Sequence, residues 1–386
     1  MTSDAVLTLN CGSSSIKFAV FERGGGRLLG GRIENLGLEP HLQAWNAEGV
    51  LIVEKKRKTG THESFFRQIL SLAKNHLDGR QLVAVGHRVV LGGDAFTAPC
   101  RLTAPVRKAL KKLEELAPLH QPHNLAAIDA VSRVRPGLPQ IACFDTAFHQ
   151  TMSATARRFG LPRAFERAGL RRYGFHGLSY EFIAGRLREL APEVASGRVL
   201  VAHLGSGASM CALRNGQSVD TSMGFSALDG LVMGSRCGAL DPGVLLHLMR
   251  QGLDASALEN MLYSQAGMLG VSGISADMRV LLASKSAKAA DATDLFVFRA
   301  VREAAALISS MGGLDAIVFT AGIGENSPEV RQRICERLAW LGLVLDPAAN
   351  RENRPEIQAT SSRVRVWALP TDEELTIARH TFSLIP

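Results

Sequence analysis

Residues 6–21 read VLTLNCGSSSIKFAVF, two apolar runs joined by a segment of glycine and serine. Both apolar runs have the composition of buried strands. The Gly/Ser segment favours a tight turn, and Glu22-Arg23-Gly24-Gly25 after the second run favours another. The stretch therefore predicts a strand, a Gly/Ser turn, a second strand and a hairpin turn.

The same pattern returns in the second half of the chain. Residues 199–213 read VLVAHLGSGASMCAL and run into the turn Arg214-Asn215-Gly216. A Gly/Ser turn between two strands directs backbone N–H groups and short hydroxyls toward one place, which suits phosphate oxygens. Either turn alone is equally compatible with an ordinary hairpin. The repetition favours a duplicated α/β domain whose two turns hold one nucleotide.

Helical and strand patterns fill the rest of the chain. Apolar residues at helical spacing predict helices over 62–76, 103–116, 179–190, 294–311 and 328–341, and Thr103 is expected to cap the second of these. Short apolar runs predict buried strands at 82–85, 140–144, 316–319 and 364–367. Strands that alternate with helices indicate the α/β class.

The charge balance is basic without indicating nucleic-acid binding. The 386 residues, enough for two or three domains, include 44 Lys and Arg against 36 Asp and Glu, a net charge of +8. The densest run, residues 55–58, has no interleaved aromatic residue and follows the strand-like residues 50–53, which favours a solvated hairpin edge. A basic cleft that attracts phosphorylated or carboxylate substrates explains the excess equally well.

The six cysteines and the chain start indicate a cytoplasmic, soluble protein. No Cys-x-x-Cys pair or zinc-like His spacing occurs. The N-terminus lacks the basic region of a signal peptide, and no apolar run approaches the ~20 residues of a membrane span.

The common phosphate-binding signatures are missing from the sequence. It contains no P-loop motif, no dinucleotide-binding glycine fingerprint and no protein-kinase signature. Phosphate must therefore be bound in another way.

Nine segments, in order along nearly the whole chain, resemble the acetate kinase family. They are NCGSSSIK (10–17), GHRVV (86–90), APLH (117–120), FDTAFH (144–149), RYGFHG (172–177), HLGSG (203–207), MGSRCG (233–238), FTAGIGEN (319–326) and TDEEL (371–375). The resemblance implies duplicated actin-like/sugar kinase (ribonuclease H-like) domains with an interdomain active-site cleft. It implies an N-terminal domain over 1–148, on which residues 371–386 pack back, and a nucleotide-binding domain over 149–370.

The resemblance also implies a reaction: reversible, Mg²⁺-dependent transfer of the γ-phosphoryl group of ATP to acetate by a homodimer, with Mn²⁺ as a possible substitute. The transferred group carries charge on three oxygens and the acceptor is itself an anion, so catalysis requires cations and positioned donors. A carboxylate has no proton to lose, so no general base is required. Arginine suits this task because its planar fork binds carboxylate or phosphate in two places.

The resemblance also assigns roles to individual residues. The catalytic residues are Asp145, His176 and Arg236, and the metal ligands are Asn10 and Glu373. The residues around the acyl substrate are Arg88, Val90, Leu119, His120 and Phe175. The residues for ATP are Lys17, Ser13, Ser15, His203, Leu204, Gly205, Ser206, Gly207, Asp277, Met278, Arg279, Gly322, Ile323, Gly324, Glu325 and Asn326.

Some of these residues also fit structural roles. His176 has the apolar neighbour expected of a buried core histidine, and His120 also fits simple packing in its loop. Glu373 also fits a carboxylate in the first turn of a helix. Asp277 and Arg279 also fit a surface ion pair.

The chain departs from the family pattern at four positions. Ser206 stands where Asn is usual, Ala239 where an acidic or polar residue is common, Tyr180 where His is common, and Ala227 where many members carry Pro at the acyl pocket. Ala227 leaves a propionate or butyrate kinase as the alternative activity. A nucleotide-switched chaperone or regulator on the same superfold would need a peptide-binding or helix-turn-helix segment, and every part of the chain is accounted for without one.

Overall fold

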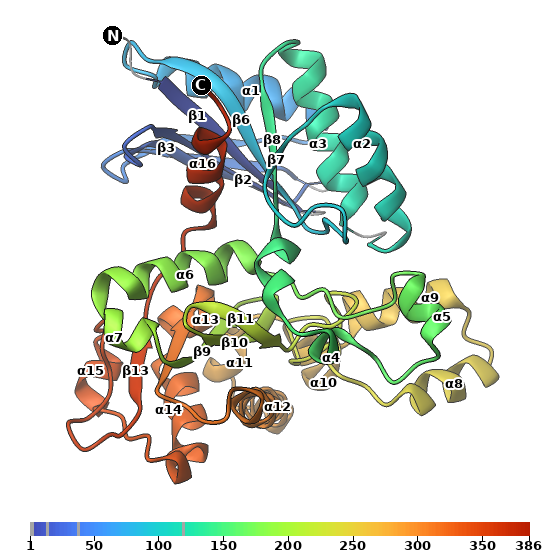
Figure 1. Cartoon of the computed structure of the whole chain (residues 1–386), viewed down its shortest axis with the longest axis vertical. Coiled ribbons are helices and arrows are strands. Elements are labelled where there is room, and N and C mark those ends of the chain that lie inside the picture. Colours follow the sequence, from blue (N-terminus) through green and yellow to red (C-terminus); the bar gives the residue numbers. More distant parts are fainter. Residues whose placement is uncertain (1–3, 13–14, 37–38, 118–119) are drawn as a thin grey trace. The chain divides into compact units, whose positions relative to one another are not determined.

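The computed structural model describes residues 4–12, 15–36, 39–117 and 120–386 (Figure 1). The chain divides into two compact units. The first comprises residues 1–148 and 372–386, and the second comprises residues 149–371. Each unit has its own sheet.

Within the described residues, the first unit is built on an eight-stranded sheet in the order β5-β4-β3-β2-β1-β6-β8-β7. Its strands are β1 (Asp4–Cys11), β2 (Ile16–Glu22), β3 (Arg27–Glu34), β4 (His41–Asn46), β5 (Leu51–Lys56), β6 (Gln81–Val89), β7 (Cys100–Arg101) and β8 (Gln140–Phe144). Strands β1 to β5 pair antiparallel in succession, whereas β1, β6 and β8 are parallel. Its helices are α1 (His62–Asn75), α2 (Ala104–Lys111), η1 (Lys112–Glu115), α3 (Gln121–Val134) and α16 (Glu373–Ser383). The 3₁₀ segment η2 (Asp145–Thr151) leads into the second unit.

The two faces of this sheet carry separate cores because side chains alternate along each strand. Leu7 of β1 belongs to a buried cluster with Phe66 of α1 and Ala130 of α3. The next residue back, Val6, belongs to a cluster with Ala378 of α16. A Cβ on Gly86 of β6 would lie 2.2 Å from the Thr381 hydroxyl oxygen of α16, so glycine lets this helix approach the strand.

Within the described residues, the second unit has a five-stranded sheet in the order β11-β10-β9-β12-β13. Its strands are β9 (Arg198–Leu204), β10 (Ala208–Arg214), β11 (Gln217–Thr221), β12 (Ala316–Thr320) and β13 (Arg365–Ala368). Strand β10 pairs antiparallel with β9 and β11, and β12 runs parallel to β9 and β13. The long helix α12 (Ala287–Met311) packs on β9 and β10, and α6 (Gly177–Leu190) and α7 (Pro192–Ala195) pack against β9.

Shorter helices complete the second unit. They are α4 (Ala154–Arg157), α5 (Arg163–Arg167), α8 (Pro242–Arg250), α9 (Ala255–Asn260), η3 (Met261–Gln265), α10 (Gly267–Ser272), α11 (Met278–Ala283), α13 (Ala321–Asn326), α14 (Pro328–Arg337), η4 (Ala339–Leu341) and α15 (Pro347–Arg351). Among the described helices, none is long and apolar enough to cross a membrane.

The predicted strand–turn–strand units are confirmed. The first is β1 and β2, and the second is β9 and β10. The basic run that begins at Lys55 starts on the exposed edge strand β5, as predicted. Thr103 caps α2 by accepting a hydrogen bond from the Val106 N–H.

Several predicted helix bounds are wrong. The helix predicted over 294–311 begins at Ala287, because the alanine-rich segment 287–292 has a strong helix propensity of its own. The helices predicted to reach 116 and 341 end as α-helices at Lys111 and Arg337, and 3₁₀ turns follow within the predicted spans. Such tightening of the final turn is common at helix ends.

Candidate functional site

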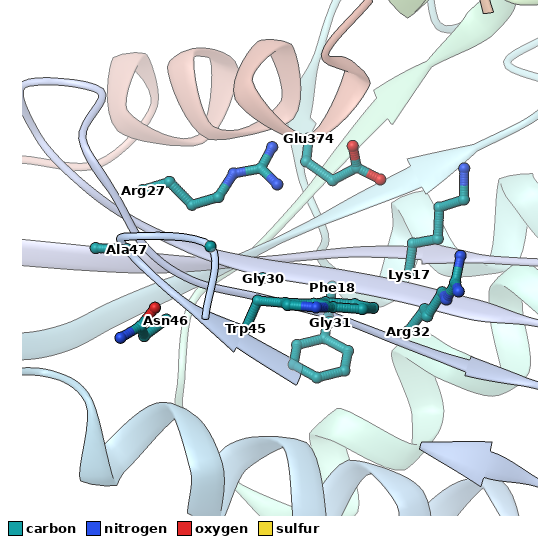
Figure 2. A pocket seen from close by; sticks show the side chains of 11 residues that line it. Lys17, Phe18, Arg27, Gly30, Gly31, Arg32, Trp45, Asn46, Ala47 and Glu374 are labelled. Carbon is teal, nitrogen blue, oxygen red and sulfur yellow. The ribbon is translucent and has the colours of Figure 1, made fainter. Parts of the chain in front are cut away.

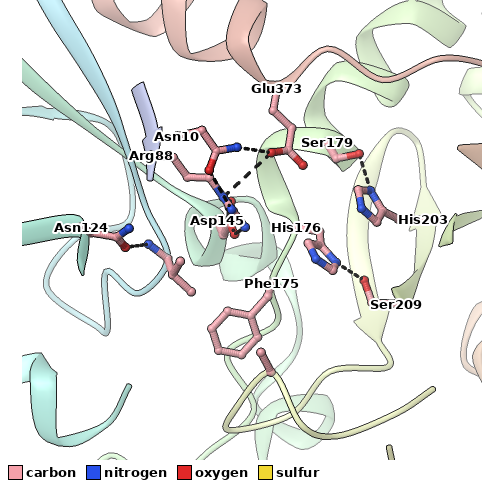
Figure 3. Close-up of polar contacts among 12 residues, drawn as sticks. Asn10, Arg88, Asn124, Asp145, Phe175, His176, Ser179, His203, Ser209 and Glu373 are labelled. Carbon is pink, nitrogen blue, oxygen red and sulfur yellow. Dashed lines mark hydrogen bonds and ion pairs between the residues drawn. The ribbon is translucent and has the colours of Figure 1, made fainter. Parts of the chain in front are cut away.

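Arg88 lies near the end of β6 and bonds side chains that are distant in the sequence (Figure 3). Its Nε is 3.1 Å from both carboxylate oxygens of Asp145, and its Nη2 donates to Asp145 Oδ2 over 2.5 Å. Its Nη1 donates to Asn10 Oδ1 over 3.0 Å. Strands β1, β6 and β8 are parallel neighbours, so their carboxyl ends bring these three residues to one edge of the sheet.

Glu373, the first residue of α16, completes this cluster. Asn10 Nδ2 donates to Glu373 Oε2 over 3.0 Å, and Arg88 Nε lies 4.0 Å from the same oxygen. The Asp145 side chain is fully buried, and that of Arg88 is 19% exposed. Burial disfavours the charged guanidinium, but the charges of Asp145 and Glu373 outweigh that effect and raise the pKa of Arg88. Arg88 is therefore held as a cation in a largely buried place.

Asn124, on α3, forms hydrogen bonds at the same carboxyl end of the strands, and the sequence prediction missed it. Its Oδ1 accepts a hydrogen bond from the Val90 N–H over 3.0 Å, and its Nδ2 donates to the Cys11 carbonyl over 2.8 Å. The sequence did carry a signal, because Ala127 and Val131 put Asn124 on the apolar face of the helix. A polar side chain on such a face normally has specific hydrogen-bond partners.

The remaining predicted residues of the first unit are partly described. Ser13 and Leu119 lie outside the described residues. The Ser15 carbonyl accepts from the Gly12 N–H over 2.8 Å and closes the turn between β1 and β2. Val90 is buried, and His120 is half-buried at the N-cap position of α3.

Lys17 lies on β2 and lines a pocket of about 370 Å³ in the first unit (Figure 2). Arg27, Arg32, Trp45 and Glu374 also line it. Burial raises the pKa of the Glu374 carboxyl, an effect that the Glu373 charge reinforces and the Lys17 charge opposes. The structure thus brings Lys17 together with Glu374.

In the second unit, His176 is the N-cap residue of α6 and has the left-handed backbone angles φ 57° and ψ 23°. Its Nδ1 lies 2.8 Å from the hydroxyl oxygen of Ser209 on β10. The Ser209 hydroxyl also bonds the Tyr180 hydroxyl. The neighbouring Phe175 is buried, and its carbonyl oxygen lies 3.0 Å from His149 Nε2.

His203, near the end of β9, stacks on His176 with the ring centres 4.2 Å apart. Its Nδ1 lies 2.8 Å from the Ser179 hydroxyl, which also bonds the Thr371 hydroxyl over 2.9 Å. Each ring of the stacked pair is therefore held at Nδ1 by a serine (Figure 3).

Arg236 and His176 converge on the turn between β9 and β10. A Cβ on Gly207 would lie 3.6 Å from His176 Nε2 and 3.8 Å from Arg236 Nη1. Arg236 Nη1 also donates to the Ala227 carbonyl over 3.2 Å. A histidine nitrogen and a guanidinium thus face one Gly/Ser turn.

A pocket of about 870 Å³ in the second unit brings together half of the sixteen residues predicted for ATP. Its predicted residues are Gly205, Ser206, Asp277, Met278, Arg279, Gly322, Ile323 and Asn326. Asp277 and Arg279 also form the surface ion pair that the sequence allowed, 2.6 Å apart. Leu204 is buried in β9, and Gly324 is buried in α13. Glu325 faces its own loop, where Oε1 accepts from the Ala321 and Thr371 N–H groups.

Comparisons with known proteins identify the family. The family model for the acetokinases matches residues 5–379. The chain belongs to the acetokinase family. An acetate kinase of Rhodopseudomonas palustris (strain ATCC BAA-98 / CGA009) is 50% identical over 392 residues, which cover 99% of this chain and 98% of that protein.

Solved acetokinase-like structures share the fold along the full chain. A propionate kinase from Francisella tularensis superposes with a TM-score of 0.92 at 35% identity and covers 100% of both chains. An acetate kinase from Porphyromonas gingivalis superposes with a TM-score of 0.88 at 36% identity, with 99% of this chain and 100% of that chain covered. The predicted α/β fold of duplicated actin-like domains is confirmed. Acetokinases are phosphotransferases that use ATP as co-substrate.

The two metal ligands predicted for this acetokinase fit a hard cation. Asn10 and Glu373 lie within hydrogen-bond distance of each other and offer amide and carboxylate oxygens, which Mg²⁺ prefers. In the part of the chain that the structure describes, no three His, Cys, Asp or Glu side chains form a complete metal site. Mg²⁺ is commonly held by one or two carboxylates, with water and substrate phosphates as its other ligands.

Arg331, on α14, supports the acetokinase segment 322–326 and was also missed. It is fully buried, and its Nη1 donates to the carbonyl oxygens of Gly324 and Glu325 over 2.9 and 2.7 Å. Burial lowers its pKa to about 10. The sequence did indicate that Arg331 is buried, because Cys335 lies four residues later and is buried on the same face of α14.

Proposed function

We propose that this acetokinase transfers the γ-phosphoryl group of ATP reversibly to acetate, giving acetyl phosphate and ADP. The observation that carries the proposal is the convergence of His176 Nε2 and Arg236 Nη1 on Gly207, next to the pocket of about 870 Å³. A donor and a cation at a Gly/Ser turn suit the charge that develops on a transferring phosphoryl group. The acetate kinase name of the 50%-identical relative supports the same substrate.

In the proposed reaction, a carboxylate oxygen forms a bond to the γ-phosphorus, and the bond from that phosphorus to the oxygen bridging to ADP breaks. Arg236 and His176 stabilise the charge on the equatorial oxygens. Gly205, Ser206 and the segment 322–326 bind the nucleotide. Lys17, Ser13 and Ser15 contribute to the same ATP site in this proposal.

We assign the cluster around Arg88 to the acceptor and to a metal ion. Arg88 binds the acetate carboxylate, and Asp145 orients its guanidinium through the contacts at 2.5–3.1 Å. Asn10 and Glu373 hold Mg²⁺, or Mn²⁺ in its place. When bound, the metal ion supplies positive charge that neutralises the phosphate oxygens.

Val90, Leu119, His120 and Phe175 surround the acyl group in this proposal. A propionate kinase is the second candidate, because Ala227 is smaller than proline and a propionate kinase is among the similar solved structures. One methylene in an apolar pocket changes selectivity by only ~10–200-fold. We therefore expect kcat/KM for acetate and propionate to lie within about tenfold, with butyrate lower.

We also propose a homodimer in the cytoplasm. Helix α8 exposes apolar side chains, with Leu246 53% exposed and Met249 52% exposed, and such a patch suits a subunit contact. The six cysteines are not joined in disulfides, which suits a reducing compartment. Analytical ultracentrifugation of the native chain and of Leu246→Glu tests the dimer, and a native monomer would exclude it.

The activity itself is tested by a hydroxamate assay with ATP, Mg²⁺ and acetate, propionate or butyrate in parallel. We expect acyl phosphate to form with acetate and propionate. Arg236→Ala should lower turnover at least ~10²-fold, because one charge-stabilising donor is lost. Arg186→Ala is the matched control, since Arg186 pairs with the exposed Glu189 at the surface. Native protein that forms no acyl phosphate from any of the three acids would contradict the proposal.

A further inference from the structure

His176 has a backbone conformation that its surroundings must hold. Its φ of 57° lies in the left-handed region that few residues other than glycine adopt. The Tyr180 N–H donates to the His176 carbonyl over 3.1 Å and starts helix α6. On the other side, His149 Nε2 lies 3.0 Å from the Phe175 carbonyl, and Gly174 leaves no room for a Cβ beside the His149 ring. The backbone at His176 is thus held from both sides.

The ring of His176 is held by a buried chain of hydroxyl groups. Ser209 and Tyr180 are both fully buried. Tyr180 lies in the first turn of α6, four residues after the N-cap residue His176. The Tyr180 hydroxyl bonds the Ser209 hydroxyl, which lies 2.8 Å from His176 Nδ1. The relay therefore runs from a phenol through a serine to one nitrogen of the imidazole.

The number of protons available gives this relay a direction. The Ser209 hydroxyl has one proton and can donate it to only one neighbour. A phenol is more acidic than an aliphatic hydroxyl, so Tyr180 is the better donor to Ser209. Ser209 then donates to His176 Nδ1, and the neutral imidazole must carry its proton on Nε2. The reverse direction would put the proton on Nδ1 and leave Nε2 as an acceptor, which repels a phosphoryl oxygen.

We propose that Tyr180 acts through Ser209 as a positioning residue that fixes the Nε2–H tautomer of His176. This inference rests on the proposed function, in which His176 Nε2 faces the transferring phosphoryl group. Nε2 is directed toward Gly207, beside Arg236 Nη1. The relay converts a histidine that could accept or donate into a permanent hydrogen-bond donor at that point.

Two imidazoles and a guanidinium pack around the relay and its histidine. His203 stacks on His176 at 4.2 Å, and the Arg236 guanidinium faces the same glycine. His149 packs edge-on against Tyr180 at 5.7 Å, and burial lowers the pKa of His149 to about 4.

Tyr180→Phe removes only the phenol oxygen and keeps the ring in the core. The His176 tautomer is then read from the ¹⁵N chemical shifts of its two ring nitrogens, assigned by comparison with His176→Gln. In the native chain we expect Nε2 to be protonated and Nδ1 not, and in Tyr180→Phe we expect both nitrogens to show exchange between tautomers. We expect kcat to fall roughly 10- to 100-fold, which does not exceed the fall expected when a hydrogen-bond donor is removed altogether. The KM for ATP should stay within about twofold of its native value.

Tyr173→Phe is the matched control, because the Tyr173 hydroxyl is also paired in the interior but bonds the Gly169 carbonyl. It should leave the tautomer and kcat near their native values. Should Tyr180→Phe fail to fold, as judged by circular dichroism, Ser209→Ala replaces it and should give the same mixed tautomer. A native His176 protonated on Nδ1, or a variant with native tautomer and native kcat, overturns the inference. A native chain without kinase activity overturns the proposed function instead, and the ¹⁵N measurement still decides the tautomer.

Discussion

Replacing Arg331 by methionine removes a guanidinium from the interior of the second unit and keeps a long, unbranched side chain. Five hydrogen bonds are lost, to the carbonyl oxygens of Gly324, Glu325 and Asn350 and to the side-chain oxygens of Asn350 and Asn353. All five acceptors are neutral, so the cation is held by dipoles rather than by a carboxylate. Gly324 and Asn350 are buried and Glu325 is half-buried, so four of the five acceptors would lose their donor away from the surface, whereas Asn353 is exposed.

The magnitude follows from two opposing effects. A hydrogen bond from a charged donor contributes ~1.5–3 kcal/mol, so five of them set an upper limit far above the expected loss. Removing the cation relieves the cost of burying it, which is the effect that lowers its pKa to about 10. We expect a net loss of about 3–5 kcal/mol in the free energy of unfolding, similar to breaking other buried charged contacts. For a unit of this size that lowers Tm by roughly 6–20 °C.

The assay combines differential scanning fluorimetry with ATP saturation kinetics. Gly324 and Glu325 belong to the segment that lines the pocket proposed for the nucleotide. We therefore expect the KM for ATP to rise by about tenfold, or ~1.4 kcal/mol, and kcat to fall by a smaller factor. Arg333→Met is the matched control on the same helix, since Arg333 pairs with Asp294 and Glu329 at the surface. Its cost should stay below about 1 kcal/mol. Equal Tm and KM changes in the two variants would refute the role of Arg331.

Further predictions concern other parts of the molecule. Arg88→Ala should lower turnover at least ~10²-fold. Asp145→Asn should raise the KM for acetate, because the guanidinium of Arg88 loses the carboxylate that orients it. Near-native kinetics in both variants would show that this cluster is not part of the active site. Ala227→Pro should increase the acetate-to-propionate ratio of kcat/KM by up to ~10-fold, and an unchanged ratio would place the acyl pocket elsewhere. Burial lowers the pKa of His87 to about 4, below its value in the unfolded chain, so the unfolded state binds more protons and stability falls as the pH drops from about 6.5 to 4. That loss is about 2 kcal/mol at pH 5, and urea unfolding of His87→Asn should show a shallower pH dependence than the native chain.

Much of the fold follows from local sequence pattern. Three features appear where the pattern predicts them: the two strand–turn–strand units, the edge strand on which the basic run starts, and the helix cap at Thr103. The reason is that alternation, turn residues and capping residues act over a few neighbouring positions. Only the start of helix α12 at Ala287 was missed, because its first turns are rich in alanine and lack large apolar side chains.

The candidate site residues were also indicated by sequence, but their hydrogen-bond partners were not. Arg88 and Asp145 are separated by 57 positions, and Asn10 and Glu373 by 363, so each contact depends on which strands lie side by side. The sequence assigned Arg88 to substrate and Asp145 to catalysis as separate residues, whereas in the structure the two side chains are bonded to each other.

By itself, the sequence determined the α/β class, the duplicated strand–turn–strand units and the residue types that a phosphotransferase needs. Only the tertiary structure decided how those side chains are held: Asn124 against Val90, Tyr180 through Ser209 to His176, and Arg331 beneath the segment 322–326. These are hydrogen bonds in the interior, where an unpaired polar group is costly and each donor must find its acceptor in space. Which acceptor lies within about 3 Å depends on strand order and helix packing, and no local pattern in the chain encodes that distance.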